Sequence, residues 1–256
     1  MSQTNTPTNG LKVSMEFTGI FILACSINLS TTYLADGSQI AHPLMIILSF
    51  FAAITITRAI SGGHINPAVT LGVYYSERPE TRLQDQQLFT IYIIAQVLGA
   101  VSATFFSFIF YKENIFKIAP SAHTTPSQAL FAEILGTFLF VYTILCQGNR
   151  LLTEWLGDRH AKLTTDNSIS TLIVSIALFA SVSISGNISG GCINPAIGFA
   201  QNFVRLLILG DVSECRFLWV YIAGPSIGGL LAAHVYRNFF MVYFTSVNDS
   251  KAIRSI

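Results

Sequence analysis

The feature that most constrains this chain is a seven-residue phrase that occurs twice. It reads Gly-Gly-His-Ile-Asn-Pro-Ala at residues 62–68 and Gly-Gly-Cys-Ile-Asn-Pro-Ala at residues 190–196. Proline suits the first turn of a helix, because it has no N–H to leave unpaired there and its φ is already helical. The asparagine before each proline is then the N-cap, and each phrase predicts the start of a helix.

The helix predicted after the first phrase is too short to cross a membrane. From Asn66 to Ser76 there are about ten helical residues, roughly 15 Å at 1.5 Å per residue, whereas the hydrocarbon core of a bilayer is roughly 30 Å thick. We therefore expect two half-helices, over residues 66–76 and 194–208. If they enter from opposite sides, their positive dipole ends and both asparagine amides face one passage near the midplane.

The composition indicates an all-α membrane protein. Of 256 residues, 52% are hydrophobic and only 11% are charged, whereas soluble domains carry about 25% charged residues. The formal net charge of +1 argues against a nucleic-acid partner. Six full transmembrane spans are predicted from hydropathy, in addition to the half-helices. They cover residues 14–34, 42–60, 86–111, 127–147, 168–186 and 215–243.

The segments between the spans are short and polar, so we expect a single membrane domain over residues 1–256 with short tails. The first span contains Glu16 and no small-residue cleavage site stands out, so it is expected to be retained and not removed as a signal peptide. With both termini on the cytoplasmic side, ten of the fourteen Lys and Arg residues fall on or near that side. This distribution agrees with the positive-inside rule for a multi-pass protein.

Three landmarks recur in the same order and indicate an internal duplication. Residues 16–21 match residues 133–138 at an offset of 117, the phrases are offset by 128, and residues 92–100 match residues 221–229 at an offset of 129. The repeats run roughly over residues 10–111 and 127–243. Because each repeat contains three spans, the second runs through the membrane upside down relative to the first. Inverted repeats of this kind place solute sites near the midplane.

These landmarks resemble the aquaporin (major intrinsic protein) family over nearly the whole chain. The resemblance implies six transmembrane helices and two re-entrant half-helices around a single-file pore in each subunit, within a homotetramer in the lipid bilayer. Water or another small neutral solute is then the only ligand expected. The sequence shows no nucleophile–base pair and no metal-ligand spacing among its cysteines, so we expect no enzyme activity, no cofactor, no metal and no disulfide.

The resemblance also assigns roles to the repeated phrases. Asn66 and Asn194 should donate side-chain N–H bonds to a passing water, while Pro67, Ala68, Pro195 and Ala196 hold the two helix starts together. Unwound backbone before each phrase would supply a ladder of acceptor carbonyls, since irregular backbone is tolerated at membrane depth where it lines a cavity. The alternative is that these glycines serve close packing only. The expected carbonyls belong to Gly62, Gly63, His64, Gly190, Gly191 and Cys192.

Roles can be assigned to four of the ionisable residues in or beside the predicted spans. Buried carboxylates are costly unless they are hydrogen-bonded, and the resemblance makes Glu16 and Glu133 anchors for the irregular loops, with a proton relay as the alternative. His64 is either a packed structural residue or a pH gate. Arg58 either extends to the cytoplasmic interface or lines a vestibule of the pore.

The chain departs from the family at the expected outer constriction. Most relatives carry an arginine directly after the second Asn-Pro-Ala, where this chain has Ile197. Spacing from the phrases places Ile46, Val182 and Gly191 at the other constriction positions, so all four are apolar or glycine. Such a ring either admits larger neutral solutes or dewets and closes the passage. Residues 198–201 read Gly-Phe-Ala-Gln, where the family pattern has Ser or Asp, then Phe, Gly and Pro.

Two functions follow from this pattern. The first is passive conduction of water, with ammonia, hydrogen peroxide and urea as further permeants; glycerol is disfavoured because its hydroxyls lose the arginine donor. The second is a non-conducting family member that serves as a packing subunit of a larger membrane assembly. If the side chain of Cys192 reaches the lumen, thiol reagents should block flux.

Overall fold

The computed structural model describes residues 7–30, 41–77, 79–110, 117–148, 167–210 and 212–243, and every regular element in this part of the chain is helical. Four helices belong to the first half of the chain and four to the second, with two short elements near the last helix. They are α1 (Asn9–Leu29), α2 (Ala41–Ser61), α3 (Pro67–Ser76), α4 (Pro79–Phe110), α5 (Pro126–Gln147), α8 (Asn167–Ser189), α9 (Pro195–Leu209), η2 (Val212–Cys215), α10 (Leu218–Val235) and η3 (Tyr236–Phe240).

The predicted fold class is confirmed. Within the described residues, six helices are long and apolar enough to cross a membrane, and α9 is a shorter apolar helix. The first span begins earlier than predicted, at Asn9, because the Thr8 hydroxyl caps the helix by accepting a hydrogen bond from Leu11 N at 3.3 Å. Residues 31–34 of the predicted first span lie outside the described residues. The last span contains a π-helical segment, η3, which the hydropathy pattern does not indicate.

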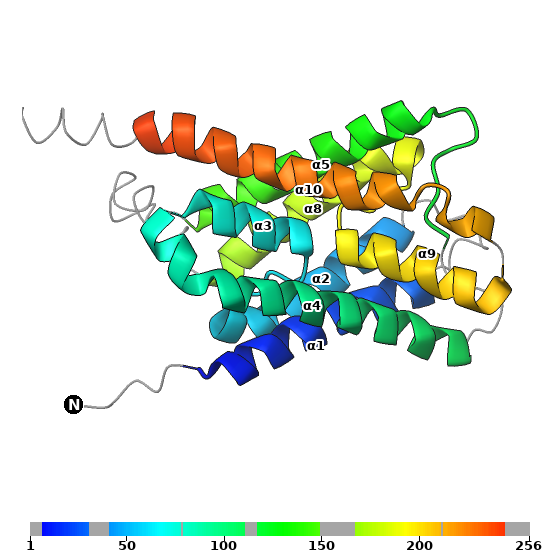
Figure 1. Ribbon diagram of the computed structural model, residues 1–256, viewed down its shortest axis with the longest axis horizontal. Helices are drawn as coiled ribbons and strands as arrows, with labels where there is room; N and C mark the ends of the chain where they lie inside the picture. The colour runs from blue at the N-terminus through cyan, green and yellow to red at the C-terminus, as the bar shows by residue number, and fades with distance from the viewer. Residues whose placement is uncertain are drawn as a thin grey trace, which may run out of the picture.

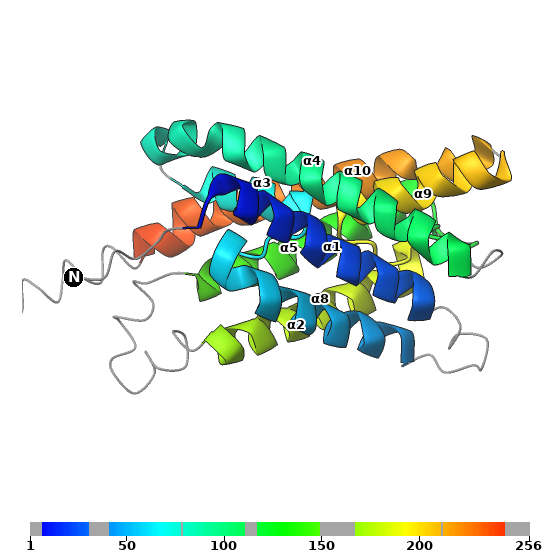
Figure 2. The same ribbon diagram turned by 90° about the horizontal axis from the view of Figure 1, so that it is seen from below.

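The two halves of the chain repeat the same packing. In the first half α1 packs on α2 and α4, and in the second half α5 packs on α8 and α10 in the same way. Each half-helix packs chiefly on the last long helix of the other half: α3 lies on α10 and α9 lies on α4. Figures 1 and 2 show this exchange, which joins the two repeats into one bundle.

Two matched glycines allow the long helices to approach closely. A Cβ atom on Gly99 of α4 would lie 2.7 Å from the Phe17 carbonyl oxygen of α1, and one on Gly228 of α10 would lie 2.5 Å from the Ile134 carbonyl oxygen of α5. Any larger residue at these two positions would force α4 away from α1 and α10 away from α5. Small residues at such positions are typical of helix pairs in membranes, where close van der Waals packing holds helices together.

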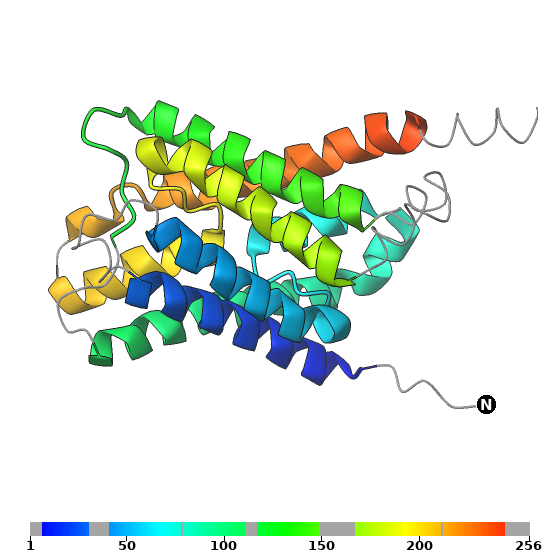
Figure 3. The same ribbon diagram turned by 180° about the vertical axis from the view of Figure 1, so that it is seen from behind.

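The half-helices run in opposite directions from the middle of the molecule (Figure 1). Helix α3 runs from the centre towards the end of the molecule where α1 begins and η3 lies, which we call the terminal end. Helix α9 runs from the centre to the opposite end, which we call the far end. Helices α2 and α8 lie side by side across the other face (Figure 3). The site therefore lies at the centre, between the starts of α3 and α9.

Candidate functional site

Both half-helices start as the repeated phrases predict. The Asn66 side-chain oxygen accepts a hydrogen bond from Ala68 N at 2.8 Å, and the Asn194 oxygen accepts one from Ala196 N at 3.0 Å. A proline follows each asparagine at the first helical position. Each asparagine thus satisfies one of the backbone donors that the first turn of a helix leaves unpaired.

The same two asparagines also join the halves of the molecule. Asn66 Nδ2 donates to the Ile193 carbonyl oxygen at 2.9 Å, and Asn194 Nδ2 donates to the Ile65 carbonyl oxygen at 3.0 Å. The tips of α3 and α9 therefore meet, as the inverted repeat predicts. A side-chain amide has two N–H groups, so each asparagine keeps one N–H that no group in the described residues accepts.

The loops before the two half-helices have matching backbone conformations. Gly62 and Gly190 have φ angles of 94° and 93°, and Gly63 and Gly191 have φ angles of 65° and 67°. The isoleucine before each asparagine also has a positive φ, 40° at residue 65 and 55° at residue 193. A β-branched residue is rarely found in this region, and such strain costs about 1–3 kcal/mol per residue. The surrounding structure must hold both loops in place.

In the first half, Glu16 holds the loop. This buried carboxylate accepts hydrogen bonds from Ser61 Oγ at 2.7 Å, His64 N at 2.9 Å and Ile65 N at 2.6 Å. A fourth donor, Gln96 Nε2, lies 2.8 Å from the carboxylate. All four partners donate, which suits a side chain that only accepts. The strained Ile65 is fixed by one of the shortest of these bonds.

In the second half, Glu133 holds the loop in the same way. It is also buried and accepts hydrogen bonds from Ser189 Oγ at 2.6 Å, Cys192 N at 2.9 Å and Ile193 N at 2.7 Å. The position that corresponds to Gln96 is Pro225, which has no side-chain donor. The second loop therefore has three hydrogen bonds to its carboxylate where the first has four.

Four residues that anchor the two loops were not identified from the sequence. Tyr92 and Tyr221 donate their hydroxyl protons to the carbonyl oxygens of Ser61 and Ser189, at 2.9 and 2.7 Å. Both tyrosines open a repeat landmark, and both serines directly precede a Gly-Gly pair. The repeated phrase therefore extends by one serine on its N-terminal side, to eight residues. This longer match in the sequence is the signal that could have identified Ser61 and Ser189.

His64 is held by packing and by one side-chain contact. Its Nδ1 lies 3.2 Å from Thr70 Oγ1, and its ring stacks on Phe89 and meets Tyr92 edge-on, with centroid separations of 5.8 and 5.5 Å. Thr70 also accepts a hydrogen bond from Gln96 Nε2 at 2.9 Å. This environment favours the structural role of His64 over a gate.

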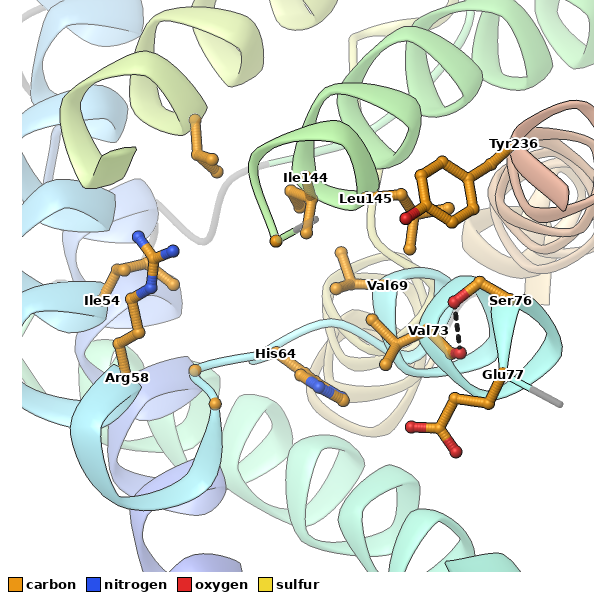
Figure 4. Close-up of a pocket in the computed structure, with 14 residues that line it drawn as sticks. Ile54, Arg58, His64, Val69, Val73, Ser76, Glu77, Ile144, Leu145 and Tyr236 are labelled. Atoms are coloured by element: carbon orange, nitrogen blue, oxygen red, sulfur yellow. Dashed lines mark hydrogen bonds between the residues drawn. The ribbon is translucent and has the colours of Figure 1, made fainter. Parts of the chain in front are cut away.

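A cavity of about 260 Å³ lies at the terminal end of the molecule, beside the end of α3 at Ser76 and the start of η3 at Tyr236. Figure 4 shows the residues that line it. The side chain of Arg58 lines it from α2, and the guanidinium donates to Ser170 Oγ at 2.9 Å and to Thr171 Oγ1 at 3.3 Å, both on α8. Of the two alternatives for Arg58, the structure supports the vestibule. The remaining lining residues are Ile54, Gly62, Gly63, His64, Val69, Val73, Ser76, Glu77, Ile144, Leu145, Gly148, Val174 and Tyr236.

Comparison with known proteins identifies this arrangement. The family model for the major intrinsic protein matches residues 13–236. The chain belongs to the major intrinsic protein family. It is therefore a multi-pass membrane channel for water or small solutes, and family members are channels rather than enzymes.

Individual relatives of this major intrinsic protein agree with the family match. The chain is 33% identical to the glycerol uptake facilitator protein-like 6 of Lactiplantibacillus plantarum over 235 residues, which cover 88% of this chain and 96% of the relative. It is 30% identical to the aquaporin AqpM of Methanothermobacter marburgensis over 210 residues, covering 78% and 77%. The crystal structure of the aquaglyceroporin from Plasmodium falciparum superposes with a TM-score of 0.77 at 20% identity, covering 93% of this chain and 99% of that one. This last match shows the fold.

The repeat relates the expected constriction of this family member to the terminal cavity. Each of the four expected constriction residues has a counterpart, at the 128-residue offset of the phrases, that lines the terminal cavity. The pairs are Ile46 and Val174, Val182 and Ile54, Gly191 and Gly63, and Ile197 and Val69.

Local packing brings two of the constriction residues together. A Cβ atom on Gly191 would lie 3.3 Å from Val182 Cγ1. Ile46 and Ile197 are 8% and 3% exposed and belong to one apolar cluster, against which Val182 packs. Ile46 and Ile197 are therefore buried in the apolar core, and the constriction at these four residues stays a prediction.

The side chain of Cys192 packs against the start of α9. Its Sγ donates to the Asn194 carbonyl oxygen at 3.1 Å, and a Cβ atom on Gly198 would lie 3.0 Å from the sulfur. Gly198 is one of the positions where this chain departs from the family pattern, and a Cβ atom there would also lie only 2.6 Å from Tyr221 Cβ, so α10 and the loop both limit the space for a larger residue. Gln201, another such position, donates through Nε2 to Asn28 Oδ1 at 2.8 Å and so ties α9 to α1.

Proposed function

We propose that this major intrinsic protein conducts water passively in single file past Asn66 and Asn194. The crossed amide bonds support this most directly. Each asparagine donates one N–H to the opposite loop at 2.9 or 3.0 Å and keeps its second N–H free of described protein acceptors. Two such donors at the junction of two half-helices suit a passing oxygen atom.

Proton exclusion follows from the same arrangement. A water that accepts hydrogen bonds from both asparagines has its oxygen fixed towards them, so it cannot relay a proton along a continuous chain of waters. The N-termini of α3 and α9 both point to this place, and each adds positive potential equivalent to about half an elementary charge. Pore diameter, lining hydrogen-bond groups and half-helix dipoles together set the selectivity of aquaporin-type channels.

The apolar constriction broadens the set of permeants to ammonia, hydrogen peroxide and urea. Ile46, Val182, Gly191 and Ile197 include no aromatic side chain and no arginine. Small solutes that need few hydrogen bonds then pass at low cost. One similar protein is named a glycerol uptake facilitator-like protein, but here the hydroxyls of glycerol would lose hydrogen bonds at an apolar ring, so we place glycerol behind the smaller solutes. The carbonyls of Gly62, Gly63, His64, Gly190, Gly191 and Cys192 are the proposed acceptors on either side.

Flux measurements on the purified protein test this function. Proteoliposomes would be compared with empty vesicles of the same lipid by stopped-flow light scattering, with water, urea, ammonia and hydrogen peroxide in one preparation. We expect water flux well above that of empty vesicles and no proton flux above it. Water flux equal to that of empty vesicles would refute the proposal.

A second candidate function is an occluded family member that packs within a larger membrane assembly. One observation favours it: Ile197 is only 3% exposed and lies in the same apolar cluster as Ile46, and a closed apolar ring dewets. The same flux experiment separates the two functions. Purification as a free homotetramer with robust water permeability would eliminate the occluded form.

Assembly and orientation complete the proposal. We place four copies in a homotetramer, and both termini on the cytoplasmic side with the terminal cavity. Cross-linking of the purified protein tests the first statement. Protease access to tags on each end, in sealed vesicles of known orientation, tests the second.

A further inference from the structure

The terminal cavity contains a charge that the family pattern does not explain. Arg58 lies eight residues before Asn66, and its half-buried guanidinium lines the cavity next to Ile54 (Figure 4). Its two hydrogen bonds go to the neutral hydroxyls of Ser170 and Thr171. Within the described residues it forms no ion pair, so its positive charge is not cancelled by a bound carboxylate.

The charge of Arg58 has no counterpart at the equivalent position of the second repeat. At the 128-residue offset of the repeat, the counterpart of Arg58 is Gly186. A Cβ atom on Gly186 would have no neighbour within 4 Å, so the space at that position is not filled by another group. The passage is therefore electrostatically asymmetric, with a cation on the terminal side of the asparagines and an apolar constriction with Ile197 on the far side.

We propose that Arg58 is the specificity-determining cation of this channel, and that its charge in the terminal cavity excludes inorganic cations from the passage. This inference rests on the proposed function, because only a conducting pore needs such a barrier. Repulsion between two unit charges about 6 Å apart lowers the occupancy of the cavity by a monovalent cation. The reduction is about threefold in bulk water and about 100-fold at an effective dielectric constant of about 20. A water molecule or a neutral solute does not experience this repulsion.

Two other charged residues bear on the barrier. Glu77 lies across the cavity from Arg58 (Figure 4), and its carboxylate would weaken the barrier without pairing with the guanidinium. The repeat offset relates Glu77 to Arg205 on α9, which makes Arg205 the competing candidate for a barrier at the far end. The experiment must therefore separate Arg58 from Arg205.

The test measures potassium efflux with an ion-selective electrode and water flux by stopped flow, in the same proteoliposomes. Arg58→Gln removes the charge and keeps a side-chain donor for Ser170 and Thr171, whereas Arg58→Lys keeps the charge. Arg58→Met is a second neutral variant, whose unbranched side chain suits the apolar wall. We expect the ratio of potassium to water flux to rise about tenfold in both neutral variants and to stay within about twofold of wild type in Arg58→Lys.

Two controls remove the same charge elsewhere. Arg237→Gln acts at the terminal end, where Arg237 is partly exposed, donates to the Tyr75 carbonyl oxygen and lies outside the cavity lining. Arg205→Gln acts on α9. We expect both to keep the wild-type ratio. If Arg237→Gln raised the ratio of potassium to water flux as much as Arg58→Gln, the effect would come from surface charge in general. If only Arg205→Gln raised this ratio, the barrier would lie at the far end. Either result would overturn the inference.

The inference and the proposed function fail in different ways. Normal water flux with an unchanged potassium ratio in Arg58→Gln and Arg58→Met would overturn the role of Arg58 and leave the water channel intact. A wild-type protein that is impermeable to water would refute the proposed function, and the role of Arg58 with it.

Discussion

Replacing Glu133 by glutamine should destabilise the protein by placing a donor where the backbone N–H of Ile193 needs an acceptor. The amide oxygen of the new side chain can take the place of Oε1 and keep the hydrogen bonds from Ser189 and Cys192. The amide nitrogen then takes the place of Oε2 and faces Ile193 N, which is also a donor. An unsatisfied buried N–H costs about 1–3 kcal/mol, and the loss of charge weakens the two remaining bonds. We expect a loss of about 2–4 kcal/mol.

The matched variant at the other repeat should lose less stability. In Glu16→Gln the new amide nitrogen faces Ile65 N and the side chain of Gln96. Gln96 can turn its amide and accept a hydrogen bond from that nitrogen, whereas Pro225 at the corresponding position in the second half has no such group. The free energies of unfolding of the two variants should therefore differ by the contribution of about one hydrogen bond, about 1 kcal/mol.

Thermal unfolding of the detergent-solubilised protein measures both effects. A loss of about 2–4 kcal/mol corresponds to a fall in Tm of about 4–16 °C for a chain of this size. Glu133→Gln should melt below Glu16→Gln, and both below wild type. If Glu133→Gln melted within about 1 °C of wild type, or above Glu16→Gln, the carboxylates would not be the anchors of the two loops.

Three further predictions follow from the site. Ile197→Arg should lower urea flux relative to water flux about tenfold, equivalent to about 1.4 kcal/mol; an unchanged solute profile in stopped flow would remove this position from the constriction. Thiol reagents should leave water flux unchanged in wild type and in Cys192→Ser alike, because the sulfur faces α9; inhibition that the mutation abolishes would place it in the lumen. Burial, and then the nearby charge of Asp85, raise the pKa of Glu77 above its usual 4.5. The folded protein thus holds this proton to higher pH than the unfolded chain, so stability should fall as pH rises from about 4.5 through the raised pKa. Glu77→Gln should flatten this part of a Tm-against-pH curve, and an unchanged slope would contradict the assignment.

Much of the fold could be predicted because local rules and the repeat agree. The Asn-Pro pairs determine the two helix starts by capping alone, and these starts lie where the sequence places them. The boundaries of the long helices were harder to predict. Helix α4 begins at Pro79, several residues before the predicted span, because hydropathy reports where a chain is apolar and the first turns of this helix are polar.

Tertiary contacts explain what the sequence left open. Arg58 has two plausible positions from sequence, and only the neighbouring hydroxyls of Ser170 and Thr171, more than a hundred residues away, select the cavity. The glycine at residue 198 suits the local packing, since a Cβ atom there would lie 2.6 Å from Tyr221 Cβ and 3.0 Å from the Cys192 sulfur. Such close approaches are visible only once the loop and the helices are placed together.

The most direct test of the channel is the water permeability of wild type compared with a variant blocked at Ile197. Ile197→Trp adds a large side chain at the proposed constriction, and Leu207→Trp adds the same side chain to an exposed position of the same helix, α9. In proteoliposomes with equal protein content, we predict that wild type and Leu207→Trp shrink much faster than empty vesicles, whereas Ile197→Trp shrinks at their rate. Equal water flux through Ile197→Trp and wild type would contradict a passage between the two half-helix tips.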